Sequence, residues 1–229
     1  MRYLVLALTL LLACAAPTAP TAPTAPTAPT APAGPAGRYP VPAPVGAIVD
    51  DAAAFATFAD AVRPDLERDA TTAPDPGTRK ERWFVLAMLD ALDGDLDAAG
   101  AALDQVAALE DSPAAKAMVG LSLRAIVDAR GPGGSGDVGA ALEARVQALP
   151  IDELRDELAM LRTMVQQFTP EVCAQLVDAE VGPHVVDGTV GIDDAHAIVF
   201  QRYAVVELIP VAADVDAVLA AHGIEPLGE

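Results

Sequence analysis

The sequence predicts an all-α protein, an irregular helical bundle that follows a disordered proline-rich linker. Hydrophobic residues make up 52% of the 229-residue chain but aromatic residues only 4%. The interior is therefore built mostly from Ala, Val and Leu, which favours closely packed helices over a β-sandwich. Apolar residues also recur at helical spacing through most of the chain after residue 46. Roughly 185 residues remain after the N-terminal signal and linker, enough for one domain of ordinary size or two small ones.

The chain begins with a short apolar segment of the kind that directs secretion. Arg2 precedes a nearly unbroken apolar run over residues 3–16, which is shorter than the roughly 20 residues that span a bilayer as a helix. The run contains "LLAC", which ends at Cys14 and resembles the lipobox of bacterial lipoproteins. The resemblance implies that residues 1–13 are a signal peptide, and that cleavage leaves Cys14 as a lipidated first residue.

Lipid attachment at Cys14 predicts a protein of the bacterial cell envelope that is anchored to a bilayer. Each buried methylene of the acyl chains, palmitate for example, contributes about 0.8 kcal/mol, and more than one chain gives stable anchoring. In that family an aspartate directly after the cysteine favours the inner membrane, and Ala15 at this place favours the outer membrane. The alternative is an ordinary secretory signal with an incidental cysteine, because small residues also precede the usual cleavage site.

Residues 14–46 are expected to form an extended spacer. Five Thr-Ala-Pro repeats occupy residues 18–32, and prolines recur as far as Pro44. Each proline fixes φ, removes a backbone donor and disfavours the helical region for the residue before it. A docking site for proline-recognising domains is the alternative, and it is less favoured because only Arg38 and Tyr39 could supply specificity.

The strong negative charge excludes several classes of partner. The chain carries 14 basic and 33 acidic residues, for a net charge of −19. Such a surface repels phosphate backbones and anionic head groups, so we expect no nucleic-acid partner. Solubility is a sufficient explanation of the charge, and binding of divalent cations or basic partners is the more specific alternative.

An α-helical domain is expected over residues 47–229. Its first helix is expected over residues 50–62, ended by Pro64 or followed there by a short turn. The Pro, Gly and Thr content of residues 70–78 predicts a loop. The apolar face of the first helix consists of Ile48, Ala52, Phe55, Ala59 and Val62.

A helical hairpin is expected over about residues 79–112. The segment resembles one tetratricopeptide repeat, a helix-turn-helix unit that usually presents a groove to peptides or proteins. The resemblance makes Trp83, Leu86 and Leu103 candidate partner-binding residues. No clear second repeat follows, because the glycine-rich residues 131–136 fall where a further helix is required, so a superhelical array is the minority alternative. The residues that match the repeat are Trp83, Leu86, Ala87, Gly94, Asp95, Ala99 and Leu103.

The second half of the chain also has helical periodicity, with a possible sub-boundary at residues 131–137. Helices are expected over residues 137–149 and 151–168, and a new helix begins at Thr169 as cap and Pro170 as first residue. The apolar stripe of residues 151–168 is explained by docking on the core, with a coiled-coil seam for a partner as the alternative. Residues 197–210 have strand propensity, but we expect a helix because no comparable strand exists to pair with them.

The sequence contains no recognisable catalytic constellation, and we expect no cofactor and no metal site. The lone thiol of Cys173 is expected to pack as a small hydrophobic group. Residues 187–194 resemble the second half of a calcium-binding loop. The residues before them lack the carboxylates that the first half of such a loop supplies, so a turn followed by an Asp-capped helix is a sufficient explanation of the pattern. The resulting hypothesis is a non-enzymatic interaction module that binds an unidentified envelope protein or peptide. The alternatives are an envelope enzyme in which Asp187, Asp194 and His196 converge in the fold, and a purely structural spacer.

Overall fold

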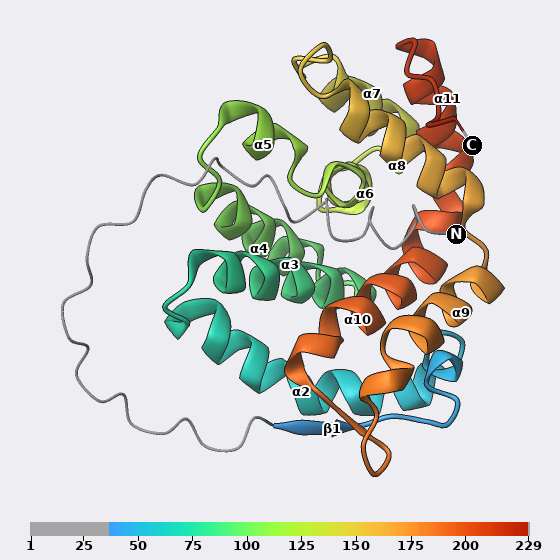
Figure 1. Cartoon of the computed structure of the whole chain (residues 1–229). Coiled ribbons are helices and arrows are strands. Elements are labelled where there is room, and N and C mark those ends of the chain that lie inside the picture. The colour runs from blue at the N-terminus through green and yellow to red at the C-terminus, as the bar shows by residue number, and fades with distance from the viewer. Residues whose placement is uncertain (1–36, 229) are drawn as a thin grey trace, which may run out of the picture.

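The computed structural model describes residues 37–228, and this part of the chain is predominantly helical, as Figure 1 shows. The expected all-α class is therefore confirmed. The expected signal peptide, Cys14 and the Thr-Ala-Pro repeats lie outside the described residues. Within residues 37–228, every helix is too short or too polar to cross a membrane.

Most elements are α-helices connected by short turns, with one two-stranded sheet. Within residues 37–228, the five elements labelled η are four short 3-10 helices and one π-helical turn. In chain order the elements are β1 (Arg38–Pro40), η1 (Val45–Val49), α2 (Ala52–Thr72), α3 (Pro76–Leu92), α4 (Leu96–Ala108), α5 (Pro113–Met118), α6 (Leu121–Arg130), α7 (Val138–Val146), α8 (Arg155–Gln167), α9 (Pro170–Glu180), η2 (Gly182–His184), β2 (Thr189–Gly191), η3 (Ile192–Asp194), α10 (Ala195–Tyr203), η4 (Ala204–Leu208), η5 (Ile209–Val211) and α11 (Ala212–Ala221).

Helix α2 continues through Pro64, contrary to the expectation that the proline ends it. Proline in a helix interior costs about 3 kcal/mol because it removes a backbone hydrogen bond and crowds the preceding turn. Pro64 lies on the exposed side of α2, where water can bond the carbonyl that lost its partner. Leu66 and Ala70 extend the buried face beyond the proline, at 0% and 1% exposure. This burial keeps the helix intact to Thr72 and shortens the loop expected over residues 70–78.

Helices α3 and α4 form the hairpin expected over residues 79–112 (Figure 1). The turn between them is a Schellman motif, in which the Asp95 N–H bonds the Asp90 carbonyl at 2.9 Å and the Gly94 N–H bonds the Ala91 carbonyl at 3.0 Å. Gly94 has φ +79°, a left-handed conformation that glycine adopts without strain. The Asp95 side chain then caps α4 by accepting from the Ala98 N–H at 3.0 Å.

The glycine-rich segment 131–136 separates α6 from α7, as expected, and Thr169 caps α9 by accepting from the Val172 N–H at 3.2 Å. Helix α8 begins only at Arg155, whereas periodicity predicted a helix from Ile151. Residues 151–154 form a turn, because Pro150 lies just before them and no side chain caps the helix at Leu154. Leu154 is nevertheless buried, so the apolar stripe extends beyond the helix that it predicted.

A small antiparallel sheet joins the start of the described chain to the segment before α10. Arg38 is opposite Gly191 and Tyr39 is opposite Val190. Asp187 and Gly188 both have positive φ, at 50° and 70°, as the two central residues of a type I′ hairpin turn require. Strand β1 also contacts α2, and it precedes the domain boundary expected at residue 47.

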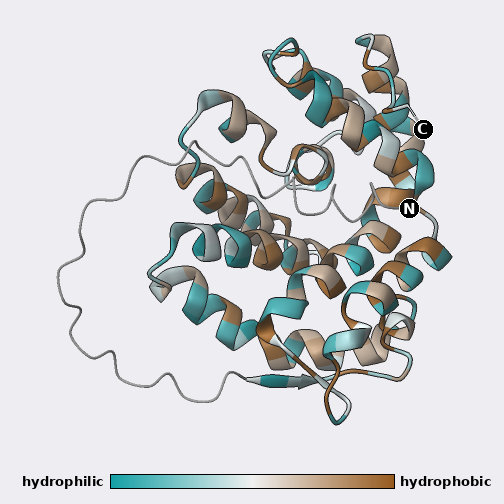
Figure 2. Ribbon diagram, viewed as in Figure 1, coloured by the Kyte–Doolittle hydropathy of each residue, from teal (hydrophilic) through white to brown (hydrophobic). Residues whose placement is uncertain are grey.

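Residues 195–221 form one bent helical run from α10 to α11. The Ile209 N–H bonds the Ala204 carbonyl, a π-helical i to i+5 bond, and Pro210, which cannot donate, follows at once. The expectation of a helix over residues 197–210 is thus correct. One hydrophobic core connects these helices with α2, α3 and α6. The ribbon of Figure 2 accordingly shows hydrophobic residues on the inward helix faces and hydrophilic residues on the outer ones.

Candidate functional site

A pocket of about 330 Å³ opens between helices α3, α5, α6, α8 and α10. This volume lies within the range of about 300–1,000 Å³ that is usual for ligand pockets. Its lining begins at Lys80 on α3 and ends at Leu208 on η4, so distant parts of the sequence build it together. Because several rigid helices contribute, the site is formed without a long loop.

The pocket wall is mainly apolar and rich in methionine. Met118 of α5 and Met160 and Met164 of α8 line it, together with Phe84 and Phe200. The whole chain has only five methionines, so three of them meet at this one site. Met118 and Met160 are half-buried, whereas Met164 is 4% exposed. Methionine is flexible and polarizable, and such walls adapt to apolar groups of different shape.

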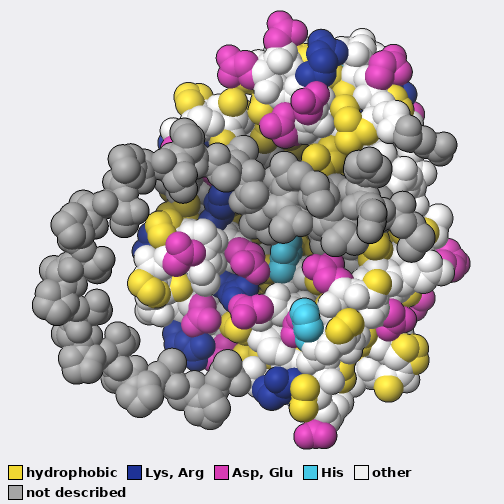
Figure 3. Space-filling model, in the orientation of Figure 1, with side chains coloured by type: hydrophobic (Ala, Val, Ile, Leu, Met, Phe, Trp, Pro, Cys, Tyr) yellow, Lys and Arg dark blue, Asp and Glu magenta, His cyan; other side chains and the backbone are white. Residues whose placement is uncertain are grey.

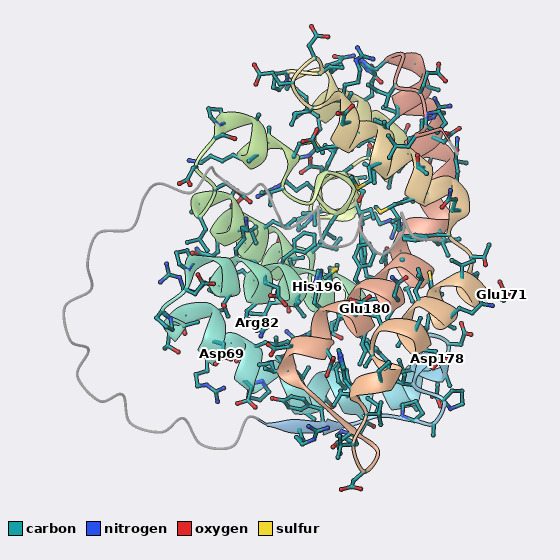
Figure 4. All side chains as sticks on the ribbon, viewed as in Figure 1. Asp69, Arg82, Glu171, Asp178, Glu180 and His196 are labelled. Atoms are coloured by element: carbon teal, nitrogen blue, oxygen red, sulfur yellow. The ribbon has the colours of Figure 1, made fainter. Side chains whose placement is uncertain are left out.

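His196, on the first turn of α10, is among the polar side chains that line the pocket, and it is labelled in Figure 4. Its ring packs edge-on against Phe84 and Phe200, with ring centroids 6.4 Å and 6.2 Å away. Burial, helped by the positive charge of Arg82, lowers the pKa of His196 to about 4. The imidazole is therefore neutral at pH 7, with one nitrogen that can donate and one that can accept a hydrogen bond.

Tyr203 lies two turns further along α10, and its ring also lines the pocket. Burial raises the pKa of its phenol, and the Ser122 hydroxyl nearby opposes this effect. The Tyr203 hydroxyl nevertheless has no hydrogen bond of regular geometry within residues 37–228. A buried hydroxyl without a partner costs free energy, and the π-helical turn that follows Tyr203 is a type of irregularity found frequently at functional sites.

The negative charges of the pocket lining outnumber its positive charges. Lys80 and Glu110 form an ion pair at 3.0 Å between their Nζ and Oε1 atoms, with 18% and 16% of the side chains exposed. Glu153 and Glu157 also line the pocket, and neither takes part in an ion pair in the described part of the chain. With His196 neutral, these two carboxylates give the pocket a net negative charge.

The candidate residues of the helical hairpin lie outside this pocket. Leu86 and Leu103 are core residues, at 3% and 0% exposure, so a partner on the surface would not touch their side chains. Trp83 is half-buried and packs against the core. Its neighbour Phe84 faces the pocket instead, because one residue step rotates a helix by about 100°.

The acidic residues considered for an enzyme do not converge on His196. Asp194 Oδ1 lies 2.7 Å from His184 Nδ1, and Asp194 Oδ2 accepts from the Gly191 N–H at 3.1 Å. Asp187 is exposed in its hairpin turn, and neither acid lines the pocket. Across residues 37–228, no group of His, Cys, Asp and Glu is arranged to hold a metal ion.

Arg82 is a buried cation beside this region, at 3% exposure. Its guanidinium pairs with Glu81 at 2.7 Å and with Asp193 at 2.5 Å. Figure 4 shows Arg82 on the side of His196 away from Glu180, while Glu171 and Asp178 lie well apart from both. Two carboxylates therefore pair with Arg82, and its positive charge adds to the larger effect of burial in lowering the pKa of His196.

No known protein family matches the chain, and neither a curated protein nor a solved structure is significantly similar to it. The chemistry of the pocket is therefore the basis for a functional proposal.

Proposed function

We propose that the protein is a lipid-anchored binding module of the bacterial cell envelope, whose pocket between α3, α5, α6, α8 and α10 accepts an apolar segment of a partner. Cys14 provides the anchor, and the residues between it and β1 act as the spacer. The module is non-enzymatic: His196 is the sole His among the pocket residues, Asp194 pairs with His184, and Asp187 is exposed in a hairpin turn outside the pocket.

The methionine-rich wall is the observation that carries the proposal. Met118, Met160 and Met164 meet from helices that are about 40 residues apart in the sequence, around a cavity of about 330 Å³. A core of ordinary packing leaves few voids larger than a water molecule. An accessible apolar volume of this size is typical of a binding site.

A neutral fluorescent probe such as N-phenylnaphthylamine tests the pocket. The full chain with Cys14→Ser should bind the probe saturably, and Met160→Gln in the same chain should weaken binding by about tenfold, because an amide would then be placed in the apolar wall. Val186 is 54% exposed and lies outside the pocket, so Val186→Gln is the matched control. Equal binding by all three chains, with unchanged circular dichroism, would reject the pocket as the site.

The anchor is tested by fractionation. We expect the native chain to sediment with membranes and to incorporate labelled fatty acid, whereas Cys14→Ser should be soluble and unlabelled, because the thiol that carries the lipid is gone. Cys173→Ser is the control for the second cysteine of the chain, and it should keep both properties. A Cys14→Ser chain that stays in the membrane fraction would refute lipid anchoring.

A further inference from the structure

The polar and apolar groups of the pocket are separated along α8. The helix turns Glu157, Met160, Leu161 and Met164 toward the pocket, at the spacing i, i+3, i+4 and i+7 of one helix face. Glu153 lies in the turn just before α8 and adds a second carboxylate to the pocket wall. The wall is thus acidic where α8 begins and apolar over the following two turns.

The two carboxylates at this end have no basic partner in the described structure. The nearest arginine in sequence, Arg155, lies on another side of the helix and pairs with Asp152 at 3.6 Å and with the Gly223 carbonyl at 3.0 Å. Arg162 pairs with Asp216 at 2.7 Å. Ion pairing within residues 37–228 therefore takes up the basic residues of α8 and leaves Glu153 and Glu157 available to an external cation.

We propose that the occupant of the pocket is a basic amphipathic helix of a partner protein, with its apolar face on the methionine wall and its Lys or Arg residues at Glu153 and Glu157. This inference rests on the proposed function and specifies the partner chemistry for the same site.

A helix suits the shape of the wall. From Glu157 to Met164 the rise along α8 is about 10 Å at 1.5 Å per residue, and Glu153 lies in the turn before the helix. A ligand must therefore place its cationic groups beyond one end of an apolar segment of about this length. Helix-in-groove recognition presents apolar anchors at i, i+3, i+4 and i+7 with charged residues beside them. Methionine-rich grooves accept such helices because the thioether side chains adapt to them.

The surface charge supports a basic partner over a neutral or acidic one. The net charge of the chain is −19, and Figure 3 shows acidic side chains at many places on the visible face of the described residues. This field steers a cationic segment to the protein and disfavours an anionic one. The unpaired carboxylates at the pocket then provide the local contacts.

The test compares two designed peptides of about five helical turns, or about 18 residues. Both have leucine at i, i+3, i+4 and i+7, and the remaining positions carry lysine in one peptide and glutamine in the other. Fluorescence anisotropy measures their binding to the full chain with Cys14→Ser. We expect the lysine peptide to bind about tenfold more tightly, a value consistent with two exposed charge pairs.

Two matched double variants separate local contacts from the general acidic field. Glu153→Gln with Glu157→Gln should abolish the advantage of the lysine peptide and leave binding of the glutamine peptide unchanged. Asp60→Asn with Glu67→Gln removes the same charge from exposed positions on α2, which contributes no residue to the pocket. That control should preserve the advantage.

Any other result would contradict the inference, and the pattern of binding would show which part of it is wrong. Equal affinity for both peptides, or equal loss in the two double variants, would show that Glu153 and Glu157 do not recognise a cation, while the apolar pocket itself would stand. Binding of the neutral fluorescent probe without binding of either peptide would reject a helix as occupant. Failure of the probe and both peptides would reject the proposed function as well.

Discussion

Two glycines with similar backbone conformation should respond very differently to alanine. Gly94 and Gly120 have φ +79° and +55°. A Cβ on Gly94 would meet no atom within 4 Å, whereas a Cβ on Gly120 would lie 2.8 Å from Leu103 Cδ2 and 3.2 Å from Phe84 Cε2. The first substitution therefore introduces backbone strain alone, and the second adds a steric clash in the core.

The expected magnitudes follow from these two contributions. A left-handed alanine costs about 1–2 kcal/mol, and the smaller entropy of the unfolded alanine chain offsets about 0.4–1 kcal/mol. We therefore expect Gly94→Ala to lower the free energy of unfolding by about 1 kcal/mol. Overpacking costs a further 1–3 kcal/mol or so, so Gly120→Ala should lose about 2–4 kcal/mol.

Urea titration followed by circular dichroism measures both values on the full chain with Cys14→Ser. Each kcal/mol should also lower the melting temperature by about 2–4 °C for a domain of this size. Because Phe84 lines the pocket, Gly120→Ala should weaken binding of the fluorescent probe, whereas Gly94→Ala should not. Equal destabilisation by the two variants, or a larger effect at Gly94, would refute the packing argument.

Three further predictions concern single side chains. Tyr39 donates a hydrogen bond to Asp65 and thereby lowers the pKa of that carboxyl, so Tyr39→Phe should cost about 1–2 kcal/mol at pH 7 in urea titrations. This loss should shrink as the pH falls below about 4 and Asp65 becomes protonated, and a constant loss would contradict the assignment. Because the native pKa of His196 is about 4 and the unfolded value about 6.5, the unfolded chain binds more protons between these values. Stability should therefore fall as the pH falls through this range, and His196→Gln should reduce the fall, whereas parallel pH profiles would argue against it. Cys173 is 0% exposed and burial raises its pKa to about 11, so in a Cys14→Ser chain it should react with an aromatic disulfide reagent only on unfolding; rapid reaction of the folded chain would contradict this burial.

Sequence patterns predicted the helices where local chemistry and burial agree. The hairpin of α3 and α4 could be predicted because its apolar faces flank a glycine at the position that requires positive φ. The start of α9 was also predictable, since Thr169 and Pro170 are a cap and a first helical residue. The extension of α2 past Pro64 was not, because it depends on the burial of Leu66 and Ala70 by other helices.

The pocket could not be found from the sequence, because its wall is assembled by tertiary packing. Met118 and Met160 are far apart in the chain, and His196 is separated from both. The spacing of Met160 and Met164 on one helix face was the available signal, but the same spacing predicts ordinary core packing. Asp194 and His196 are two residues apart and were considered as catalytic partners. At the start of α10 their side chains have different neighbours, because Asp194 contacts His184 and His196 packs against Phe84.

The pairing of β1 with β2 determines where a pulling force on the N-terminal side of the chain acts on the fold. A force applied to the chain before Arg38 would be transmitted first to the hydrogen bonds between residues 38–40 and 189–191, and from there into α10. Strand β1 also contacts α2, where Tyr39 bonds Asp65, so such a force would act on that helix as well. A recombinant fragment that starts at residue 47 would lack this strand and leave Val190 without its cover.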